Sequence, residues 1–370
     1  MRHIRCLLLI LSLVFSAAAT PPPSLLEHGQ LDGAFYAIAS PPEGIAWNGS
    51  LLLLAHGFRP ETAPVVADLN PNHLAYQTLL NQGWIVAKTS YRRNGIIVAD
   101  ALLDLDNLRQ HIAEKFGPPR RVIVEGDSMG GTIATLMAER GGRDYQGFVA
   151  VGAALDLRET DGANGVAIRP QIPLLFVANR SEIAGPSAYV ETAKSLADSQ
   201  IIAPKLFRID RDGHVNVNQA ERLFAIESLG SWLDRGGDSL PRLASTRKGF
   251  DATHPPPPQA SQVKIDSDQR GLVAQVTDIS AIYGNAWINL QPHDLIEIGL
   301  TPGLWFEAKI HDQTYRVRYG KDFSSVEKGQ WVIFPNADGY FWLSRNWANA
   351  AETAKLSIGD TIHLRRYNSE

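Results

Sequence analysis

A serine between glycines is the first group in this sequence that could do chemistry. The Gly-Asp-Ser-Met-Gly string at 126–130 follows the apolar run 121–125 and precedes a helical stretch that ends near Arg140. A Gly-x-Ser-x-Gly motif between a strand and a helix is typical of a nucleophile elbow, which exposes the serine hydroxyl on a sharp turn. The glycines are needed because larger residues two positions away would collide with neighbouring backbone. The motif predicts that Ser128 is a nucleophile.

A base and an acid follow Ser128 in the sequence. His214 lies just after the apolar run 205–209, in a loop from which an imidazole can take a proton from Ser128. Glu182 lies after the run 173–178 and can orient that imidazole and stabilise its charged form. The order nucleophile, acid, base predicts acyl transfer through a Ser-His-Glu triad.

Backbone amides could hold the negative charge that develops in such a reaction. The His-Gly-Phe string at 56–58 directly follows the apolar run 51–55. The backbone N–H of Phe58, together with that of Met129 after the nucleophile, would form an oxyanion hole. One donor of this kind is typically worth about 3 kcal/mol in the transition state.

Two parts of the triad assignment have alternatives. Asp156 follows the run 148–152 and is the alternative position for the acid. His214 could instead be an ordinary turn residue, with Asp210 and Asp212 as local turn formers.

The elements around these residues alternate between strand and helix. Six apolar runs have the length and continuity of buried parallel strands: 51–55, 84–88, 121–125, 148–152, 173–178 and 205–209. Four further stretches have helical character: 71–82, 98–116, 187–199 and 219–233. The alternation predicts an α/β domain over residues 30–235, with a doubly wound, mostly parallel sheet covered on both faces.

The pattern changes after residue 235. Residues 236–263 contain Gly-Gly and four consecutive prolines at 255–258, which predicts a stiff linker. Residues 264–370 then hold short alternating runs, rich in aromatic and β-branched residues and separated by Gly, Asn and Asp. They predict a second, smaller all-β barrel domain.

Residues 30–235 resemble the α/β-hydrolase superfamily. The strings Ala-Trp-Asn-Gly at 46–49, His-Gly-Phe at 56–58 and Ser-Tyr-Arg at 90–92 are similar to those of a group of secreted bacterial hydrolases within it. The resemblance implies a serine nucleophile, a covalent acyl-enzyme, and no metal or cofactor. The sequence departs from the pattern at Glu182, where most relatives have Asp. Hormone-sensitive-lipase relatives share the Gly-Asp-Ser-x-Gly-Gly string but carry His-Gly-Gly-Gly, and only one glycine follows His56 here.

The barrel region resembles the C-terminal domain of the S-adenosylmethionine hydroxide adenosyltransferases and fluorinases. The resemblance rests on the strings 282–289 and 339–346, followed by Asn-Ala-Ala at 349–351. It implies an adenine-containing ligand that meets Asn285, Arg345 and Asn346, with Phe323 as a candidate for stacking on the base. It also implies homo-oligomers, because that family builds its site between subunits.

The family's N-terminal catalytic domain is missing from this chain, so its S-adenosylmethionine chemistry does not carry over. An alternative is that the barrel serves only for packing and self-association.

The first residues have the pattern of an export signal. Arg2 and Arg5 precede the apolar run 7–15, and small residues follow at 16–19. We therefore expect residues 1–19 to be removed and the mature protein to be periplasmic or secreted, with no membrane association. Cys6, the only cysteine, lies in this leader, so the mature chain can form no disulfide.

Composition excludes several protein classes. The chain of 370 residues is 44% hydrophobic and 20% charged, which is ordinary for a globular protein and excludes a disordered or fibrous one. It has 35 basic against 39 acidic residues and a net charge of −4. Nucleic acid is therefore not an expected partner, because no basic surplus is available to bind phosphates.

These observations predict an exported serine hydrolase that cleaves an ester-type acyl bond of a small molecule, without cofactors or metal. One alternative is an adenine- or nucleoside-binding protein with an inert hydrolase domain. A third hypothesis combines the two, as a hydrolase acting on a nucleoside-bearing substrate.

Overall fold

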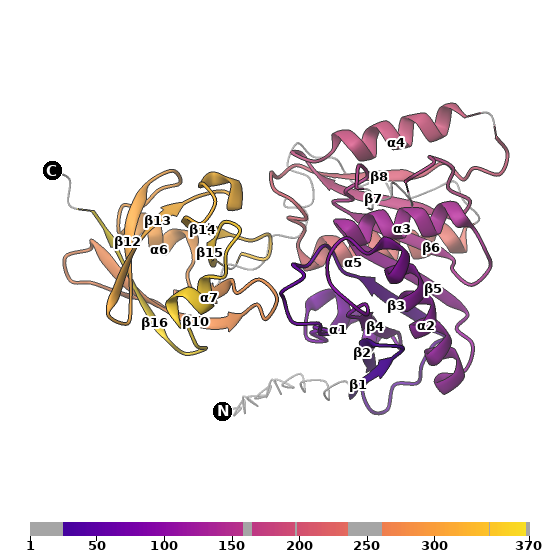
Figure 1. Ribbon diagram of the computed structural model, residues 1–370, viewed down its shortest axis with the longest axis horizontal. Coiled ribbons are helices and arrows are strands. Elements are labelled where there is room, and N and C mark those ends of the chain that lie inside the picture. The colour runs from indigo at the N-terminus through magenta and orange to yellow at the C-terminus, as the bar shows by residue number, and fades with distance from the viewer. Residues whose placement is uncertain (1–24, 158–164, 197, 236–260, 340, 368–370) are drawn as a thin grey trace, which may run out of the picture.

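The structure, a computed structural model, describes residues 25–157, 165–196, 198–235, 261–339 and 341–367. It contains two eight-stranded sheets, one in each half of the chain (Figure 1). The predicted leader, and most of the predicted linker, lie outside these residues. Among the helices that are described, none is both long and apolar enough to cross a membrane.

The first sheet is mostly parallel, which confirms the predicted fold class. Its strand order is β1-β2-β4-β3-β5-β6-β7-β8. Only the pairs β1–β2 and β2–β4 are antiparallel. The strands are β1 (Leu25–Leu31), β2 (Ala34–Ser40), β3 (Ser50–Ala55), β4 (Ile85–Thr89), β5 (Arg121–Asp127), β6 (Gly147–Val151), β7 (Leu174–Asn179) and β8 (Lys205–Ile209).

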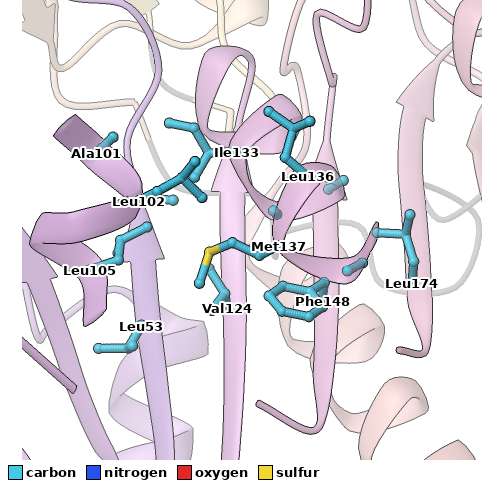
Figure 2. Close-up of a cluster of buried hydrophobic side chains, with 14 of the residues drawn as sticks. Leu53, Ala101, Leu102, Leu105, Val124, Ile133, Leu136, Met137, Phe148 and Leu174 are labelled. Atoms are coloured by element: carbon cyan, nitrogen blue, oxygen red, sulfur yellow. The ribbon is translucent and has the colours of Figure 1, made fainter. Parts of the chain in front are cut away.

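Helices cover both faces of this sheet. They are α1 (Leu74–Asn81), α2 (Val98–Phe116), α3 (Met129–Arg140), α4 (Ala184–Ser195) and α5 (Gln219–Asp234). One core joins α2, α3 and α4 to the sheet, and its centre is drawn in Figure 2; a second core joins α1 and α5 to the opposite face. Helix α2 buries Leu105, Leu108 and Ile112 as its apolar periodicity predicts, and it ends at Gly117, whose φ of +96° suits glycine.

The starts of two helices and one unpredicted hairpin are the main differences from the sequence predictions. Helix α1 begins at Leu74 rather than residue 71, after a turn. Helix α4 begins at Ala184 rather than residue 187, because Pro186 fits into the first helical turn, where no backbone donor is lost. The hairpin β1–β2 was not predicted, since β1 has an exposed and polar sequence at the edge of the sheet.

The second sheet closes into a barrel. Seven strands form the ring β11-β15-β14-β13-β12-β16-β10, closed by the β10–β11 pair, and β9 is added outside it on β10. Only β13–β14 is a parallel pair. The strands are β9 (Lys264–Ile265), β10 (Gly271–Ile279), β11 (Ala286–Ile288), β12 (Trp305–Ile310), β13 (Gln313–Tyr319), β14 (Trp331–Pro335), β15 (Phe341–Arg345) and β16 (Thr361–Arg366).

Short helices cover the barrel. They are α6 (Pro292–Glu297), α7 (Ala350–Ala354) and the 3₁₀ turn η2 (Phe323–Ser325). The interior is apolar, with buried residues such as Phe306 and Phe341 from opposite parts of the ring. The barrel therefore has its own hydrophobic core, as expected for a separate folding unit.

Candidate active site

The turn between β5 and α3 has the geometry of a nucleophile elbow. Ser128 has φ +55° and ψ −113°, a strained conformation for a non-glycine residue. The motif glycines are required by space, because a Cβ on Gly126 would lie 2.0 Å from the Gly130 carbonyl oxygen. A Cβ on Gly130 would lie 1.9 Å from the carbonyl oxygen of Ala55 in β3. Close packing of strand and helix thus forces the turn that carries the serine.

The structure brings Ser128, His214 and Glu182 into one hydrogen-bonded chain. His214 Nε2 lies 2.8 Å from Ser128 Oγ, and His214 Nδ1 lies 2.5 Å from Glu182 Oε2. The three residues follow β5, β8 and β7, and the carboxyl ends of these parallel strands lie at the same edge of the sheet. This arrangement can remove a proton from the serine hydroxyl.

Backbone contacts fix the Glu182 carboxylate. Its Oε1 accepts hydrogen bonds from the backbone N–H groups of Asn179 and Val215, at 3.3 and 3.2 Å. Gly152, with φ +54°, makes room for it, since a Cβ there would lie 2.9 Å from Glu182 Oε1. The hydrogen bond that His214 Nδ1–H donates to Glu182 raises the pKa of His214, against the opposing effect of burial.

The two alternatives to this triad are not what the structure shows. Asp156 is exposed on the loop after β6 and has no hydrogen bond or ion pair with His214, so Glu182 occupies the acid position. His214 is more than a turn residue, because its two ring nitrogens contact Ser128 and Glu182, while Asp210 and Asp212 of the same loop both bind Arg180, at 2.7 and 2.9 Å.

Two backbone donors face no acceptor at the elbow. Neither the Phe58 N–H nor the Met129 N–H donates a hydrogen bond to any residue that the structure describes. The loop after β3 lies against the nucleophile, since a Cβ on Gly57 would be 3.2 Å from Ser128 Cβ. These two amides are therefore available for an oxyanion.

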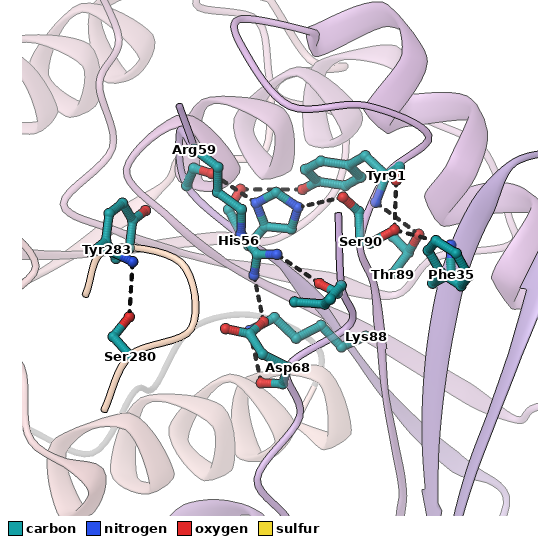
Figure 3. A network of polar contacts seen from close by, with 12 residues as sticks. Phe35, His56, Arg59, Asp68, Lys88, Thr89, Ser90, Tyr91, Ser280 and Tyr283 are labelled. Atoms are coloured by element: carbon teal, nitrogen blue, oxygen red, sulfur yellow. Dashed lines mark hydrogen bonds and ion pairs between the residues drawn. The ribbon is translucent and has the colours of Figure 1, made fainter. Parts of the chain in front are cut away.

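The peptide that carries the Phe58 N–H is held by a buried histidine. His56 Nδ1 lies 2.7 Å from the Gly57 carbonyl oxygen, and Nε2 lies 2.9 Å from that of Ser90 (Figure 3). Burial, followed by the charges of Arg59 and Lys88, lowers the pKa of His56 to about 3. The imidazole is therefore neutral and donates to one carbonyl at a time, which gives it a structural role in this loop.

A buried ion cluster beneath the elbow was missed by sequence reasoning. Arg222 of α5 contacts Glu125 at 2.6 Å and Asp127 at 2.8 Å, and both carboxylates belong to the strand that leads to Ser128. Burial raises the pKa of Glu125, against the effect of Arg222. The only signal in the sequence was a pair of acidic residues at the end of an apolar run.

The predicted ligand residues of the barrel take part in its own hydrogen bonding. Arg345 donates to the Gly329 carbonyl and to Thr353, and the Asn346 amide donates to the Val326 carbonyl. Asn285 is buried in the loop between β10 and β11. Phe323 packs edge-on against Phe334, with ring centroids 4.9 Å apart.

Within the described ranges, the structure contains no group of three or more His, Cys, Asp or Glu side chains that could hold a metal ion.

Two contacts join the barrel to the hydrolase-like domain near the triad. The hydroxyl of Tyr283 in the β10–β11 loop donates a 2.6 Å hydrogen bond to the Phe58 carbonyl. Asp338, in the β14–β15 turn, accepts a 2.9 Å bond from the backbone N–H of Gln219, the first residue of α5. Neither contact has a signal in the sequence.

Two parts of the chain match known families. Residues 97–208 match the family described as serine aminopeptidase, S33. Residues 276–363 match the SAM hydroxide adenosyltransferase C-terminal domain. Each match covers less than half of the chain. The protein thus combines an α/β-hydrolase domain with a barrel of the adenosyltransferase C-terminal type, and both recognised resemblances are confirmed.

Several solved structures are similar at low identity. An uncharacterized conserved protein from Thermotoga maritima is 16% identical over 37% of this chain and 49% of its own, with a TM-score of 0.27. An acylaminoacyl peptidase from Pyrococcus horikoshii is 11% identical over 58% of this chain and 42% of its own, with a TM-score of 0.42. A serine hydrolase without lid from Xanthomonas campestris is 14% identical over 60% of this chain and 96% of its own, with a TM-score of 0.37. This chain covers less than half of the length of the first two of these proteins.

Proposed function

We propose that the protein is a serine hydrolase that cleaves an acyl bond, with an ester as its preferred substrate. The observation that carries the proposal is the continuous contact from Ser128 Oγ through His214 to Glu182, at 2.8 and 2.5 Å. The match of residues 97–208 to a serine aminopeptidase family supports the broad class of hydrolase. It leaves the choice between ester and amide to experiment.

In the proposed mechanism, Ser128 Oγ attacks the carbonyl carbon of the substrate while its proton passes to His214 Nε2. Glu182 stabilises the imidazolium that forms, because its carboxylate accepts from Nδ1. The carbonyl oxygen becomes an oxyanion, which accepts hydrogen bonds from the N–H groups of Phe58 and Met129. Each donor of this type lowers the barrier by about 3 kcal/mol.

The acyl-enzyme then forms and is hydrolysed by the same groups. The tetrahedral intermediate collapses, and His214 returns the proton to the leaving oxygen or nitrogen as the scissile bond breaks. Water replaces the leaving group and attacks the acyl carbon while its proton passes to His214. The second tetrahedral intermediate then collapses, the bond between the acyl carbon and Ser128 Oγ breaks, and His214 returns the proton to Oγ, which releases the acid and restores the hydroxyl. No metal or cofactor takes part in this sequence of steps.

Matched substrates test the proposal. A p-nitrophenyl ester and a p-nitroanilide with the same acyl group differ only in the atom that leaves. We expect hydrolysis of the ester by the wild-type protein and none by Ser128→Ala. If the anilide were hydrolysed faster than the ester, the triad assignment would stand, but the preferred substrate would be an amide. Full activity of Ser128→Ala would refute the proposal.

An adenine-containing ligand on the barrel is a second proposal, supported by the family match of residues 276–363. Asn285 is the best remaining candidate for a residue that contacts this ligand, because Arg345 and Asn346 already donate hydrogen bonds within the barrel. Calorimetric titration with adenosine and S-adenosylmethionine tests it. Binding without esterase activity would favour a ligand-binding protein, and binding together with activity would favour a nucleoside-bearing substrate.

Export to the periplasm or medium and self-association are proposed on sequence grounds alone. The mass of the mature N-terminus tests cleavage near residue 19, and sedimentation of the purified protein tests whether it forms homo-oligomers. Neither result changes the assignment of the triad.

A further inference from the structure

The oxyanion loop receives a hydrogen bond from the other domain. Phe58 lies in the loop after β3, and its carbonyl oxygen accepts a 2.6 Å hydrogen bond from the hydroxyl of Tyr283, 225 residues further along the chain. Figure 3 shows Tyr283 and Ser280 of the barrel in the same view as His56 and Arg59 of the other domain. A barrel residue thus contacts the backbone of a proposed catalytic donor.

The backbone on both sides of Phe58 is held by hydrogen bonds. The Gly57 carbonyl, which shares a planar peptide with the Phe58 N–H, lies 2.7 Å from His56 Nδ1. The next peptide carries the Phe58 carbonyl that Tyr283 holds. The two contacts therefore restrain the peptides on either side of the Phe58 Cα, the first through the His56 tautomer protonated at Nδ1, and so limit the rotation that would turn the Phe58 N–H away.

The loop that carries Tyr283 is itself rigidly built. The Tyr283 N–H donates to Ser280 Oγ at 3.1 Å, and the Gly284 N–H donates to the Ser280 carbonyl at 2.8 Å. The Gly284 carbonyl accepts in turn from the N–H of Ala351 in α7, at 2.8 Å. The hydroxyl is therefore presented from a short, hydrogen-bonded loop, although 44% of the Tyr283 side chain is exposed.

The phenol is in the form that can donate. Partial desolvation of the hydroxyl at the contact raises the pKa of Tyr283, although 44% of the side chain is exposed, so the hydroxyl keeps its proton at neutral pH. The other side of the loop is fixed by Arg59, which is only 3% exposed and binds Asp68 and the Val66 carbonyl. The Phe58 carbonyl thus lies next to a residue anchored in its own domain and accepts a hydrogen bond from one hydroxyl of the barrel.

We propose that Tyr283 is a positioning residue for the hydrolase reaction, so that the docked barrel completes the oxyanion hole through the Phe58 backbone. The proposal rests on the proposed function, because it concerns the same reaction. A hydrogen bond that orients the donor N–H, without contacting the substrate, stabilises the transition state more than the bound substrate. Its loss should therefore lower kcat and leave KM nearly unchanged.

Tyr283→Phe in the full chain tests the proposal, with Tyr315→Phe as the matched control. The substitution removes one oxygen atom and keeps the ring. Tyr315 is another barrel tyrosine, partly buried whereas Tyr283 is exposed, and its hydroxyl has no hydrogen bond to another described residue. We expect Tyr283→Phe to lower kcat about 5- to 10-fold, with KM within about twofold of wild type. Tyr315→Phe should retain the wild-type kcat, and both variants should melt near the wild-type temperature.

Three outcomes would overturn this role. An unchanged kcat in Tyr283→Phe would show that the hydroxyl does not position the donor. A rise in KM alone would make Tyr283 a substrate contact, and an equal loss in Tyr315→Phe would mean a general effect on the barrel. A failure of the proposed function would give a different result. In that case Ser128→Ala would retain activity, whereas Ser128→Ala would be inactive if only the role of Tyr283 were wrong.

Discussion

Glu182 and His214, which lie 32 residues apart in the chain, share a 2.5 Å contact between Oε2 and Nδ1. This contact raises the pKa of His214, so it determines the pH at which the imidazole is free to act as a base. Below that pKa the ring is protonated and cannot accept the Ser128 proton. The relationship therefore links the position of one carboxylate to the acid limb of the pH–rate profile.

Replacing the acid should shift this limb. Glu182→Gln removes the negative charge, so the pKa of His214 falls and the acid limb of kcat/KM moves to lower pH than in the wild type. The loss of tautomer control should also lower kcat, by about 10³–10⁴-fold. A pH series from 5 to about 9 with one ester substrate measures both effects.

Glu182→Asp is the matched control, since it keeps the charge and shortens the side chain. Its acid limb should stay closer to that of the wild type than the limb of Glu182→Gln does. If the midpoint were the same in wild type and Glu182→Gln, Glu182 would not be the partner of His214.

A methyl group at Gly152 should displace the acid. The added Cβ of Gly152→Ala would lie 2.8 Å from Val215 Cγ2 and 2.9 and 3.0 Å from the two Glu182 carboxylate oxygens, and the residue has φ +54°. We expect kcat to fall about 10-fold or more, because a small misplacement of a catalytic group is costly. Steady-state kinetics together with a thermal melt measure the effect.

Gly117→Ala provides the comparison for backbone strain. Gly117 has φ +96° and ψ +164°, and a Cβ there would meet nothing within 4 Å. It should cost about 1–3 kcal/mol of stability and leave kcat unchanged. Equal kcat values for the two alanine variants would show that crowding of Glu182 has no effect on catalysis.

The buried ion cluster should matter for stability. Arg222→Met leaves the carboxylates of Glu125 and Asp127 without their shared cation, in a site where both Arg222 and Glu125 are buried. Removing one partner of a buried pair typically costs about 3–5 kcal/mol. Urea unfolding, followed by circular dichroism, should show this loss.

Arg93→Met is the surface counterpart, because Arg93 forms an exposed 2.7 Å pair with Asp100. Such pairs contribute about 0–1 kcal/mol. The interpretation of the cluster would be wrong if the two variants unfolded at the same urea concentration.

Much of the fold and the grouping of the triad could be predicted from the sequence, for identifiable reasons. Buried parallel strands such as β3 (Ser50–Ala55) are continuous apolar runs, so their positions are visible without a structure. The elbow glycines are fixed by local crowding. The order Ser128, Glu182, His214 then follows from the order of the strands, because polar residues after parallel strands meet at one edge.

Contacts that depend on tertiary packing could not be predicted in this way. Arg222 reaches Glu125 across 97 residues, and nothing in the local pattern of α5 marks this arginine as buried. The Tyr283–Phe58 bond depends on how two domains dock, which neither domain's periodicity encodes. The hairpin β1–β2 was missed because an edge strand that faces solvent lacks a strong apolar pattern.

Covalent labelling of Ser128 tests the central claim most directly. A fluorophosphonate reacts with a serine only where a neighbouring base and an oxyanion hole activate it. By intact mass, the wild-type protein should gain a single adduct, and peptide mapping should place it on Ser128. Ser195→Ala, at an exposed serine at the end of α4, should label like the wild type. The account predicts no adduct on Ser128→Ala, and an adduct of wild-type yield on that variant would contradict it.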